Sequence, residues 1–347
     1  MTQHDKIGPE RGGYRCIATE EGFTIPEIVE ASQKLFAAEP ERFASTIKAT
    51  QTFPMEAHLA WREQLLDLGQ GRIAQMDAHG VDTQVLLLSY SGVQCFEPRQ
   101  GLELARLAND RLSEAMRRHP GRLAGLATAP PQDPDAAAQE IERAVRDLGL
   151  KGALINSHTN GEYLDLPKYR PIFEVLNKLG VPLYLHPREP SPVLIEGYLP
   201  YGLEGPVWGY GAEVAIHALR LIFSGLFDDF PNLRIVIGHG GEGIPPMLFR
   251  IDHRSAMEGQ HTRGRRLRRK PSEYFKANFA VTSSGNNWPP LLELCREVVG
   301  IDNLMFAIDH PFEDNAQALA QVAEVSFTAE DKQKFFQTNA ERIFRLD

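Results

Sequence analysis

The sequence predicts a single (β/α)8 barrel of the TIM type. Three observations support this fold class: short apolar runs alternate with amphipathic stretches of helical length, the runs number eight, and each is continuously apolar rather than alternating. Continuous apolar runs are typical of parallel strands that are buried on both faces. Eight such units with helical connections favour a closed barrel over an open doubly wound sheet. No glycine-rich nucleotide-binding fingerprint follows the first run, which also disfavours the open sheet.

The predicted strands are short, and the segments between them are long enough for helices. In chain order the strands are Arg15–Thr19, Thr83–Ser89, Ala124–Ala129, Ala153–Asn156, Leu183–His186, Arg234–Gly238, Ala280–Ser283 and Met305–Asp309. Leu102–His119 carries apolar residues at helical spacing. Pro134–Leu148 is a predicted helix with Asp133 as its N-cap. The last predicted helix, Ala329–Arg345, has an apolar face.

Two long segments interrupt this rhythm. Thr24–Gly80 follows the first strand and includes a predicted helix, Leu59–Asp77, so we expect it to cover or flank the barrel mouth. Arg188–Gly209 follows the fifth strand and is rich in proline and glycine. Loops at this end of a barrel commonly form substrate lids, and a contact with another subunit is an equal alternative. We expect one domain over residues 1–347, with residues 1–13 as a flexible arm.

The composition limits the classes of partner. The chain has 347 residues, 42% of them apolar and 24% charged, which is ordinary for a globular domain with a sizeable core. A formal net charge of −9 argues against a nucleic-acid partner, because phosphate binding needs clustered Lys and Arg. No apolar run approaches the roughly 20 residues that a membrane span needs. Three unclustered cysteines and the lack of a signal-peptide core predict a cytoplasmic location.

Side chains of the types that commonly bind metal ions lie at the ends of five predicted strands. Carboxylates and imidazoles are preferred ligands of divalent ions, at about 2.0–2.2 Å. A single such histidine is more often a packing residue, and a single aspartate is more often a helix cap. Because several lie at the ends of different strands of one barrel, we predict that they share an ion at its mouth. The candidates are Glu20, His158, His186, His239 with Glu242, and Asp309.

Five motifs resemble those of the amidohydrolase-superfamily decarboxylases, the relatives of aminocarboxymuconate-semialdehyde decarboxylase. The resemblance extends from Tyr14 to Leu346 and is greatest to the 5-carboxyvanillate branch, with the γ-resorcylate and 2,3-dihydroxybenzoate branches nearby. The motifs are Ile17–Glu21, Ile155–Thr159, Tyr184–Pro187, Gly238–Glu242 and Phe336–Ala340. The Glu-Glu pair of the first motif is more specific than any single His-Pro or Gly-His.

The resemblance implies one divalent ion, with Mn2+ favoured and Zn2+ or Mg2+ as alternatives, and a homodimer or homotetramer. It implies Glu20, His186 and Asp309 as metal ligands, with Asp309 also donating a proton to the substrate. His239 would be a catalytic histidine that Glu242 orients. The residues expected to contact the substrate are Arg220, Phe312, His158 and Phe23, with a core role as the alternative for Phe23.

Three regions depart from the family patterns. Gly22 stands where the γ-resorcylate branch has a histidine, so Glu20 is the single ligand expected from the first strand. Phe312 matches that branch, whereas the carboxyvanillate branch has a tyrosine. Ala57 and His58 occupy the region where the carboxyvanillate enzymes have an arginine. These departures bear on substrate choice more than on the predicted type of reaction.

The predicted reaction is the non-oxidative decarboxylation of a small aromatic acid with an ortho hydroxyl group. Loss of CO2 leaves negative charge on an aryl carbon, so we expect the carboxylated carbon to be protonated first, with a divalent ion lowering the pKa of the neighbouring hydroxyl. Asp309 would donate the proton and Arg220 would offset the substrate's charge. The alternatives are a metal-dependent hydrolase and a non-enzymatic binding protein that kept the barrel.

Overall fold

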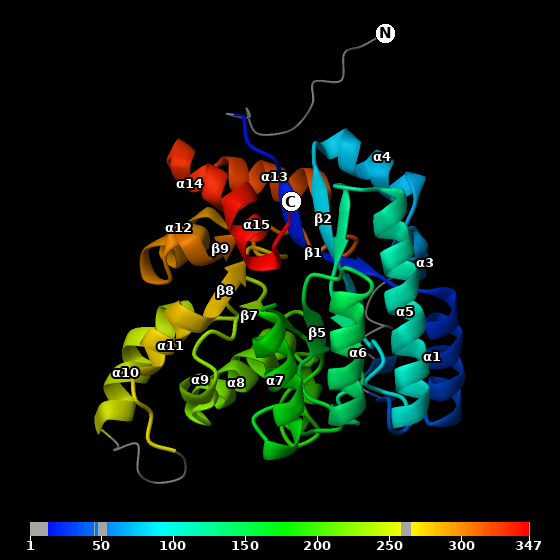
Figure 1. Cartoon of the computed structure of the whole chain (residues 1–347), viewed down its shortest axis with the longest axis horizontal. Coiled ribbons are helices and arrows are strands. Elements are labelled where there is room, and N and C mark those ends of the chain that lie inside the picture. Colours follow the sequence, from blue (N-terminus) through cyan, green and yellow to red (C-terminus); the bar gives the residue numbers. More distant parts are fainter. Residues whose placement is uncertain (1–12, 45, 48–53, 258–264, 347) are drawn as a thin grey trace.

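A computed structural model describes residues 13–44, 46–47, 54–257 and 265–346. In these residues short strands occupy the centre and helices lie around them, with α1, α5 and α6 on one side and α10, α11 and α12 on the other (Figure 1). The predicted flexible arm lies, apart from Gly13, outside the described residues. No helix within these ranges is both long and apolar enough to cross a membrane.

The strands pair in chain order, and every pair is parallel. They form one sheet in the order β1-β2-β3 and a second in the order β4 to β9. Thr19 N donates to Phe306 O (3.1 Å) and Gly22 N donates to His310 O (2.7 Å), so β1 also bonds to the segment after β9. The strands are β1 Ile17–Phe23, β2 Thr83–Leu88, β3 Leu123–Gly125, β4 Ala127–Thr128, β5 Ala153–Asn156, β6 Leu183–His186, β7 Ile235–Ile237, β8 Phe279–Thr282 and β9 Leu304–Met305.

The third predicted strand is divided into β3 and β4 because the chain changes neighbours at Leu126. Leu126 N donates to Leu86 O of β2 (2.9 Å), whereas Ala127 N donates to Gly152 O before β5 (2.8 Å). One continuous segment therefore links the two sheets, as expected of a strand in a barrel. The number and order of the strands agree with the eight predicted units when β3 and β4 are counted as one strand.

Strand β1 is longer than predicted and irregular. It continues through Glu20 to Phe23 instead of ending at Thr19, and all seven of its residues are buried. Its register on β2 advances by three residues from Ala18 to Glu21, while β2 advances by only two. One extra residue is thus accommodated in β1, which is a β-bulge and locally redirects the side chains.

The segment after β1 forms α1 Pro26–Ala38, α3 Met55–Leu66 and α4 Gln70–His79. The predicted helix Leu59–Asp77 is therefore wrong as a single helix. It breaks at Asp67, whose Oδ1 accepts a hydrogen bond from Gly69 N (2.7 Å) and starts a turn. The last turn of α3 lies on the end of β1, because Thr24 N donates to Leu65 O (2.9 Å).

The remaining helices connect the strands on the outside of the sheet. Asp133 caps α6 as predicted, since its Oδ1 accepts a hydrogen bond from Ala136 N (3.1 Å). The last predicted helix is interrupted by a π-helical turn, Lys334–Thr338. The helices are α5 Pro98–Arg118, α6 Pro134–Arg146, α7 Arg170–Leu179, α8 Gly209–Phe223, α9 Leu226–Asp229, α10 Leu248–Met257, α11 Pro271–Asn278, α12 Pro289–Val298, α13 Asn315–Ala323, α14 Ala329–Gln333 and α15 Asn339–Phe344.

The second insertion, between β6 and α8, contains two short 3-10 turns, Ile195–Gly197 and Leu199–Tyr201. Several of its apolar side chains are exposed, with Tyr201 at 85% and Trp208 at 63%. The insertion is fixed at its start because Ser191 N donates to the buried Glu213 carboxylate of α8 (3.0 Å). Its predicted role as a lid or a subunit contact stays a prediction.

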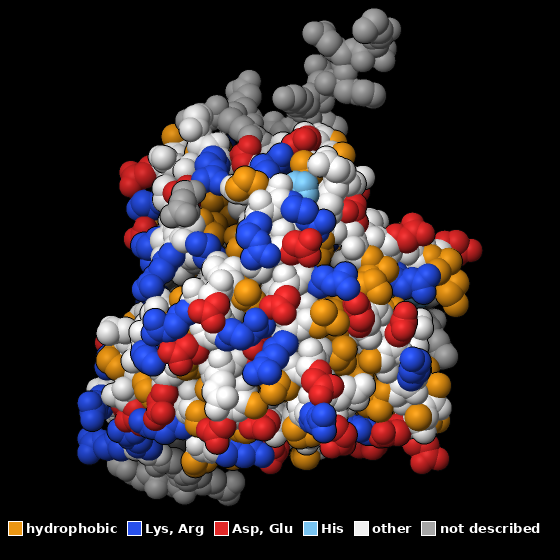
Figure 2. All heavy atoms as spheres, turned by 45° about the vertical axis from the view of Figure 1, so that its right-hand side comes forward, with side chains coloured by type: hydrophobic (Ala, Val, Ile, Leu, Met, Phe, Trp, Pro, Cys, Tyr) orange, Lys and Arg blue, Asp and Glu red, His pale blue; other side chains and the backbone are white. Residues whose placement is uncertain are grey.

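The outer surface mixes charges of both signs. On the face shown in Figure 2, acidic and basic side chains are interspersed with apolar ones. Ion pairs join neighbouring helices, as between Arg143 of α6 and Asp110 of α5 (2.8 Å), and between Arg111 of α5 and Glu27 of α1 (2.6 Å). Exposed pairs of this kind contribute little stability, on the order of 0–1 kcal/mol each, so the buried apolar strands dominate the fold.

Candidate metal and active site

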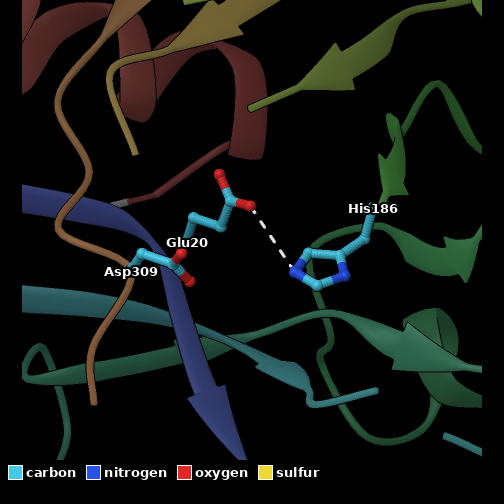
Figure 3. A group of neighbouring side chains, drawn as sticks. All are labelled: Glu20, His186 and Asp309. Atoms are coloured by element: carbon cyan, nitrogen blue, oxygen red, sulfur yellow. Dashed lines mark ion pairs between the residues drawn. The ribbon is translucent and has the colours of Figure 1, made fainter. Parts of the chain in front are cut away.

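Glu20, His186 and Asp309 converge from three separate segments of the chain (Figure 3). Glu20 comes from the middle of β1, His186 ends β6, and Asp309 follows β9. One ligand atom of each residue lies within 4.8 Å of those of the other two. Glu20 and His186 are buried, whereas the Asp309 side chain is 19% exposed, which places the solvent-facing side of the cluster at Asp309.

The two carboxylate oxygens of Glu20 have different surroundings. Oε2 accepts hydrogen bonds from Tyr184 OH and from Thr282 Oγ1 (2.9 Å). Oε1 is buried and has no hydrogen-bond partner among the described residues, and it lies 3.5 Å from His186 Nε2. Gly238 allows this arrangement, because a Cβ at that position would lie 2.6 Å from Oε2. A buried, unpartnered carboxylate oxygen beside an imidazole nitrogen fits a bound cation.

His186 is oriented by its other ring nitrogen. His186 Nδ1 lies 2.9 Å from Asn156 Oδ1, and because that oxygen only accepts, Nδ1 carries the hydrogen and Nε2 faces the cluster. Asn156 is itself held by Gln94, whose Oε1 accepts a hydrogen bond from Asn156 N (2.6 Å). Burial lowers the pKa of His186, which favours the neutral imidazole that a metal requires.

Asp309 has a backbone conformation that is rare for a residue with a side chain. Its φ is +79°, in the left-handed region that favours glycine. The carbonyl of Asp309 accepts hydrogen bonds from Phe312 N (2.8 Å) and Glu313 N (3.2 Å), which close a tight turn. Strained residues of this kind commonly lie at functional sites, where the surrounding contacts hold them.

His239 lies beside Asp309, after β7. Its Nε2 is 3.6 Å from Asp309 Oδ2, and its Nδ1 donates to Glu242 Oε1 (2.8 Å). Burial opposes a charge on the ring, but attraction to the carboxylates of Glu242, Glu20 and Asp309 outweighs it and raises the pKa of His239 well above its usual value. The predicted pairing of His239 with Glu242 is present, and their catalytic roles stay a proposal.

The donor set of the cluster fits one divalent ion. Two carboxylates and one imidazole are ligands that Mn2+ and Zn2+ both accept, and three protein ligands leave coordination positions open for a substrate. Glu21, although adjacent to Glu20, is not part of the cluster, because both of its oxygens accept backbone hydrogen bonds. Gly22, which replaces the histidine of the γ-resorcylate branch, packs under Leu65 of α3.

Two predicted substrate contacts have other partners in the structure. Arg220, in the last turn of α8, makes two 2.8 Å hydrogen bonds to the carboxylate of Asp165. His158 is buried, with Nδ1 accepting from Gly161 N (3.1 Å) and Nε2 donating to Glu189 O (3.2 Å). These contacts give both side chains a structural role, and their predicted contact with substrate stays a prediction.

The two predicted aromatic contacts differ in exposure. Phe23 is completely buried and belongs to the hydrophobic core, the alternative that the sequence analysis retained. Phe312 is 40% exposed, and its ring meets Trp61 of α3 edge to face, with the centroids 5.6 Å apart. Trp61 in turn meets the ring of His58 at 5.4 Å. Phe312 thus joins Asp309, three residues earlier, to the helix that lies over β1.

Sequence reasoning missed the residues that orient the predicted ligands. These are Tyr184 and Thr282 around Glu20, and Asn156 around His186. The sequence carried one signal for Tyr184: it lies two residues before His186 in the same strand, so both side chains point to the same face. The other two end strands β8 and β5, at the edge where the predicted ligands lie.

A serine, a histidine and a glutamate meet next to this site but are arranged differently from a hydrolytic triad. His217 Nε2 accepts from Leu164 N (3.0 Å), so Nδ1 carries the hydrogen and donates to Ser157 Oγ (3.0 Å). Ser157 Oγ then donates to Glu213 Oε1 (3.0 Å). In a triad the histidine accepts the serine proton, whereas here it donates to the serine. The group is therefore a structural network, and it does not supply a nucleophile.

This network predicts a measurable pH dependence of stability. Burial lowers the pKa of His217 to about 3, below the value near 6.5 of an unfolded histidine. The unfolded chain therefore binds a proton that the folded chain rejects, and stability is lost as the pH falls below about 6.5. We expect the wild type to lose on the order of 2 kcal/mol more than His217→Gln between pH 7 and pH 5, measured by urea unfolding. Parallel pH profiles of the two proteins would contradict a neutral, buried His217.

The chain belongs to the amidohydrolase family, whose model matches residues 53–346. A curated relative, γ-resorcylate decarboxylase of Rhizobium sp., is 39% identical over 345 residues, which cover 95% of this chain and 98% of the relative. The similarity extends over nearly the whole of both chains.

Two solved structures have the same fold over all or nearly all of their length. One is 5-carboxyvanillate decarboxylase from Novosphingobium aromaticivorans, with manganese and 4-hydroxy-3-methoxy-5-nitrobenzoic acid. It is 39% identical, covers 100% of both chains and has a TM-score of 0.93. The other is dihydroxybenzoic acid decarboxylase from Polaromonas sp., with manganese and 2-nitroresorcinol. It is 37% identical, covers 96% of this chain and 97% of its own, and has a TM-score of 0.85. The predicted barrel fold and family resemblance are confirmed.

Proposed function

We propose that this protein is a metal-dependent decarboxylase of small aromatic acids that carry a hydroxyl group ortho to the carboxylate. The observation that carries the proposal is the convergence of Glu20, His186 and Asp309, with one Glu20 oxygen unpartnered and His239 beside Asp309. The relatives reported above are decarboxylases, and two of their structures contain manganese, which favours decarboxylation over the hydrolase alternative. Mn2+ is accordingly the favoured ion.

In this mechanism the bound ion would lower the pKa of the ortho hydroxyl and align the ring. Asp309 would deliver a proton from its carboxyl group to the carboxylated ring carbon. The bond to the carboxylate then breaks, CO2 leaves, and the electron pair returns to the ring, so a proton replaces CO2 without any co-reactant. His239, held by Glu242, would supply a proton to Asp309 from Nε2, 3.6 Å away. Arg220 would offset the negative charge of the substrate.

The cysteines and the exposed apolar side chains bear on the location and the assembly of the enzyme. We expect it in the cytoplasm, because all three cysteines are free and buried. We expect self-association into a homodimer or homotetramer, with the exposed apolar side chains of the insertion before α8 as the contact. Size-exclusion chromatography with light scattering measures the assembly directly.

The test is CO2 release from a panel that includes γ-resorcylate and 5-carboxyvanillate. We expect chelator-treated protein to be inactive, and Mn2+ to restore release of one CO2 for each phenol formed. The product phenol is identified by mass spectrometry, so that hydrolysis of an ester or amide substrate is distinguished. If no acid in the panel releases CO2 with Mn2+, Zn2+ or Mg2+ present, the proposed activity is wrong.

A further inference from the structure

Glu21 is a completely buried acid that the proposed mechanism does not use. Its Oε1 accepts a hydrogen bond from Ile308 N (3.0 Å), and its Oε2 accepts one from His310 N (3.1 Å). These two amides belong to the residues directly before and after Asp309. One carboxylate of β1 therefore bridges the backbone on both sides of the proposed proton donor.

Asp309 needs such support because its φ of +79° is unfavourable for a residue with a side chain. The hydrogen bonds of its own carbonyl with Phe312 and Glu313 close the turn after it. The residues on either side of Asp309 are held as well: their amides donate to Glu21, the carbonyl of Ile308 accepts from Gly285 N (3.3 Å), and the carbonyl of His310 accepts from Gly22 N (2.7 Å). A different φ at Asp309 would turn its carboxylate away from Glu20 and His186.

The backbone next to Glu21 is bonded to a buried arginine. Arg72 of α4 donates to the carbonyl of Gly22 (2.7 Å) and to Gln84 Oε1 of β2 (3.0 Å). Burial raises the pKa of Glu21 to about 8, although the two amide hydrogen bonds and, to a smaller extent, the charge of Arg72 oppose the rise. The arginine thus holds the neighbouring residue Gly22, while the Glu21 side chain bonds to the backbone on both sides of Asp309.

We propose that Glu21 is a positioning residue that keeps the backbone of Asp309 in the left-handed conformation and thereby directs its carboxylate toward Glu20 and His186. The consequence for turnover rests on the proposed function, whereas the consequence for metal binding does not. Direct ligation by Glu21 is disfavoured, because both of its oxygens are occupied by amide hydrogens.

The test is Glu21→Gln, which keeps the shape but replaces one accepting oxygen by a donating NH2 group that opposes a backbone N–H. We expect Mn2+ affinity, measured by calorimetric titration of the chelator-treated protein, to weaken about 10- to 100-fold, as when other residues that orient ligands are lost. We expect kcat to fall at least as much, with KM changed little. The Mn2+ electron paramagnetic resonance spectrum should show altered ligand symmetry.

The matched control is Asn339→Asp, an equally conservative exchange at a buried residue that begins α15. Asn339 Nδ2 donates to Ile301 O (2.7 Å) and Leu304 O (2.9 Å), so the exchange removes buried bonds to the backbone around β9 without touching the Asp309 turn. We expect its melting temperature to fall, with wild-type Mn2+ affinity and kcat.

Glu21→Asp is the second variant, because it keeps the carboxyl group but is one methylene too short to reach both amides. Unchanged Mn2+ affinity in either folded variant overturns the proposal, and so does failure of both variants to fold while Asn339→Asp folds, since the role is then structural. If the wild type releases no CO2 from any acid, the proposed function fails, yet the Mn2+ comparison still decides the role of Glu21.

Discussion

Asp309→Asn is expected to bind Mn2+ and to lose nearly all decarboxylation. Asparagine has the same shape, keeps an oxygen for the ion and tolerates the left-handed backbone better than most residues. Its amide cannot donate a proton to a ring carbon, so the contribution of general acid catalysis should disappear. We expect kcat to fall by about 10²- to 10⁴-fold. CO2 release and metal content are measured on the same preparation.

Asp314→Asn is the matched control for this exchange. Asp314 lies five residues further on and caps α13, with Oδ1 accepting from Gln317 N (2.8 Å). Asparagine is also a good N-cap, so this variant should keep both its stability and its activity. Full activity in Asp309→Asn with Mn2+ bound would remove Asp309 from the mechanism as proton donor.

Glu20→Gln is expected to lose the metal. The exchange removes the charge from the most buried ligand of the cluster while its neighbours Tyr184 and Thr282 can still bond to the side chain. Loss of a direct ligand should weaken Mn2+ affinity by more than the roughly 10- to 100-fold effect of losing an orienting neighbour. Turnover should fall with metal occupancy, and added Mn2+ should recover only part of it.

Thermal unfolding gives a second measure of the same variant. Mn2+ at 100 times its dissociation constant should stabilise the wild type by about 2.7 kcal/mol and should leave Glu20→Gln unchanged. Without metal, Glu20→Gln should be at least as stable as the wild type, because a buried charge beside Asp309 is gone. Glu140→Gln, an equally buried exchange on α6, should keep the Mn2+ response. Equal Mn2+ stabilisation of Glu20→Gln and the wild type would exclude Glu20 as a ligand.

The sequence was sufficient to predict the barrel and the side chains that converge at its mouth, because both follow from simple periodicity. Continuous apolar runs mark strands buried on both faces, and residues that follow parallel strands lie at one edge. On this basis the candidates at five strand ends could be grouped, and the family resemblance then implied Glu20, His186 and Asp309 as the ligands, although 289 positions, 309 minus 20, separate the first and last of them.

The features that the sequence could not predict depend on contacts between distant segments. The bulge at Glu20 is a matter of register against β2, and the end of α3 is placed on β1 by the hydrogen bond from Thr24 N to Leu65 O. Arg220 carries a charge that suits a substrate, but its neighbour Asp165 lies 55 positions away and pairs with it. The local sequence pattern contains no information on such pairs. It can therefore indicate that a charged residue is a candidate for a substrate contact, but it cannot indicate which residue of the protein that side chain pairs with.

The extra residue in β1 limits which changes in chain length the site can tolerate. Because of it, two consecutive acids can serve different tasks, one beside the proposed ion and one on a neighbouring turn, although adjacent positions of a regular strand face opposite ways. Surface loops around a barrel mouth generally tolerate insertions and deletions. Strand β1 should be less tolerant. Deletion of one residue would restore the regular alternation of side chains, so one of the two acids would face the outer helices.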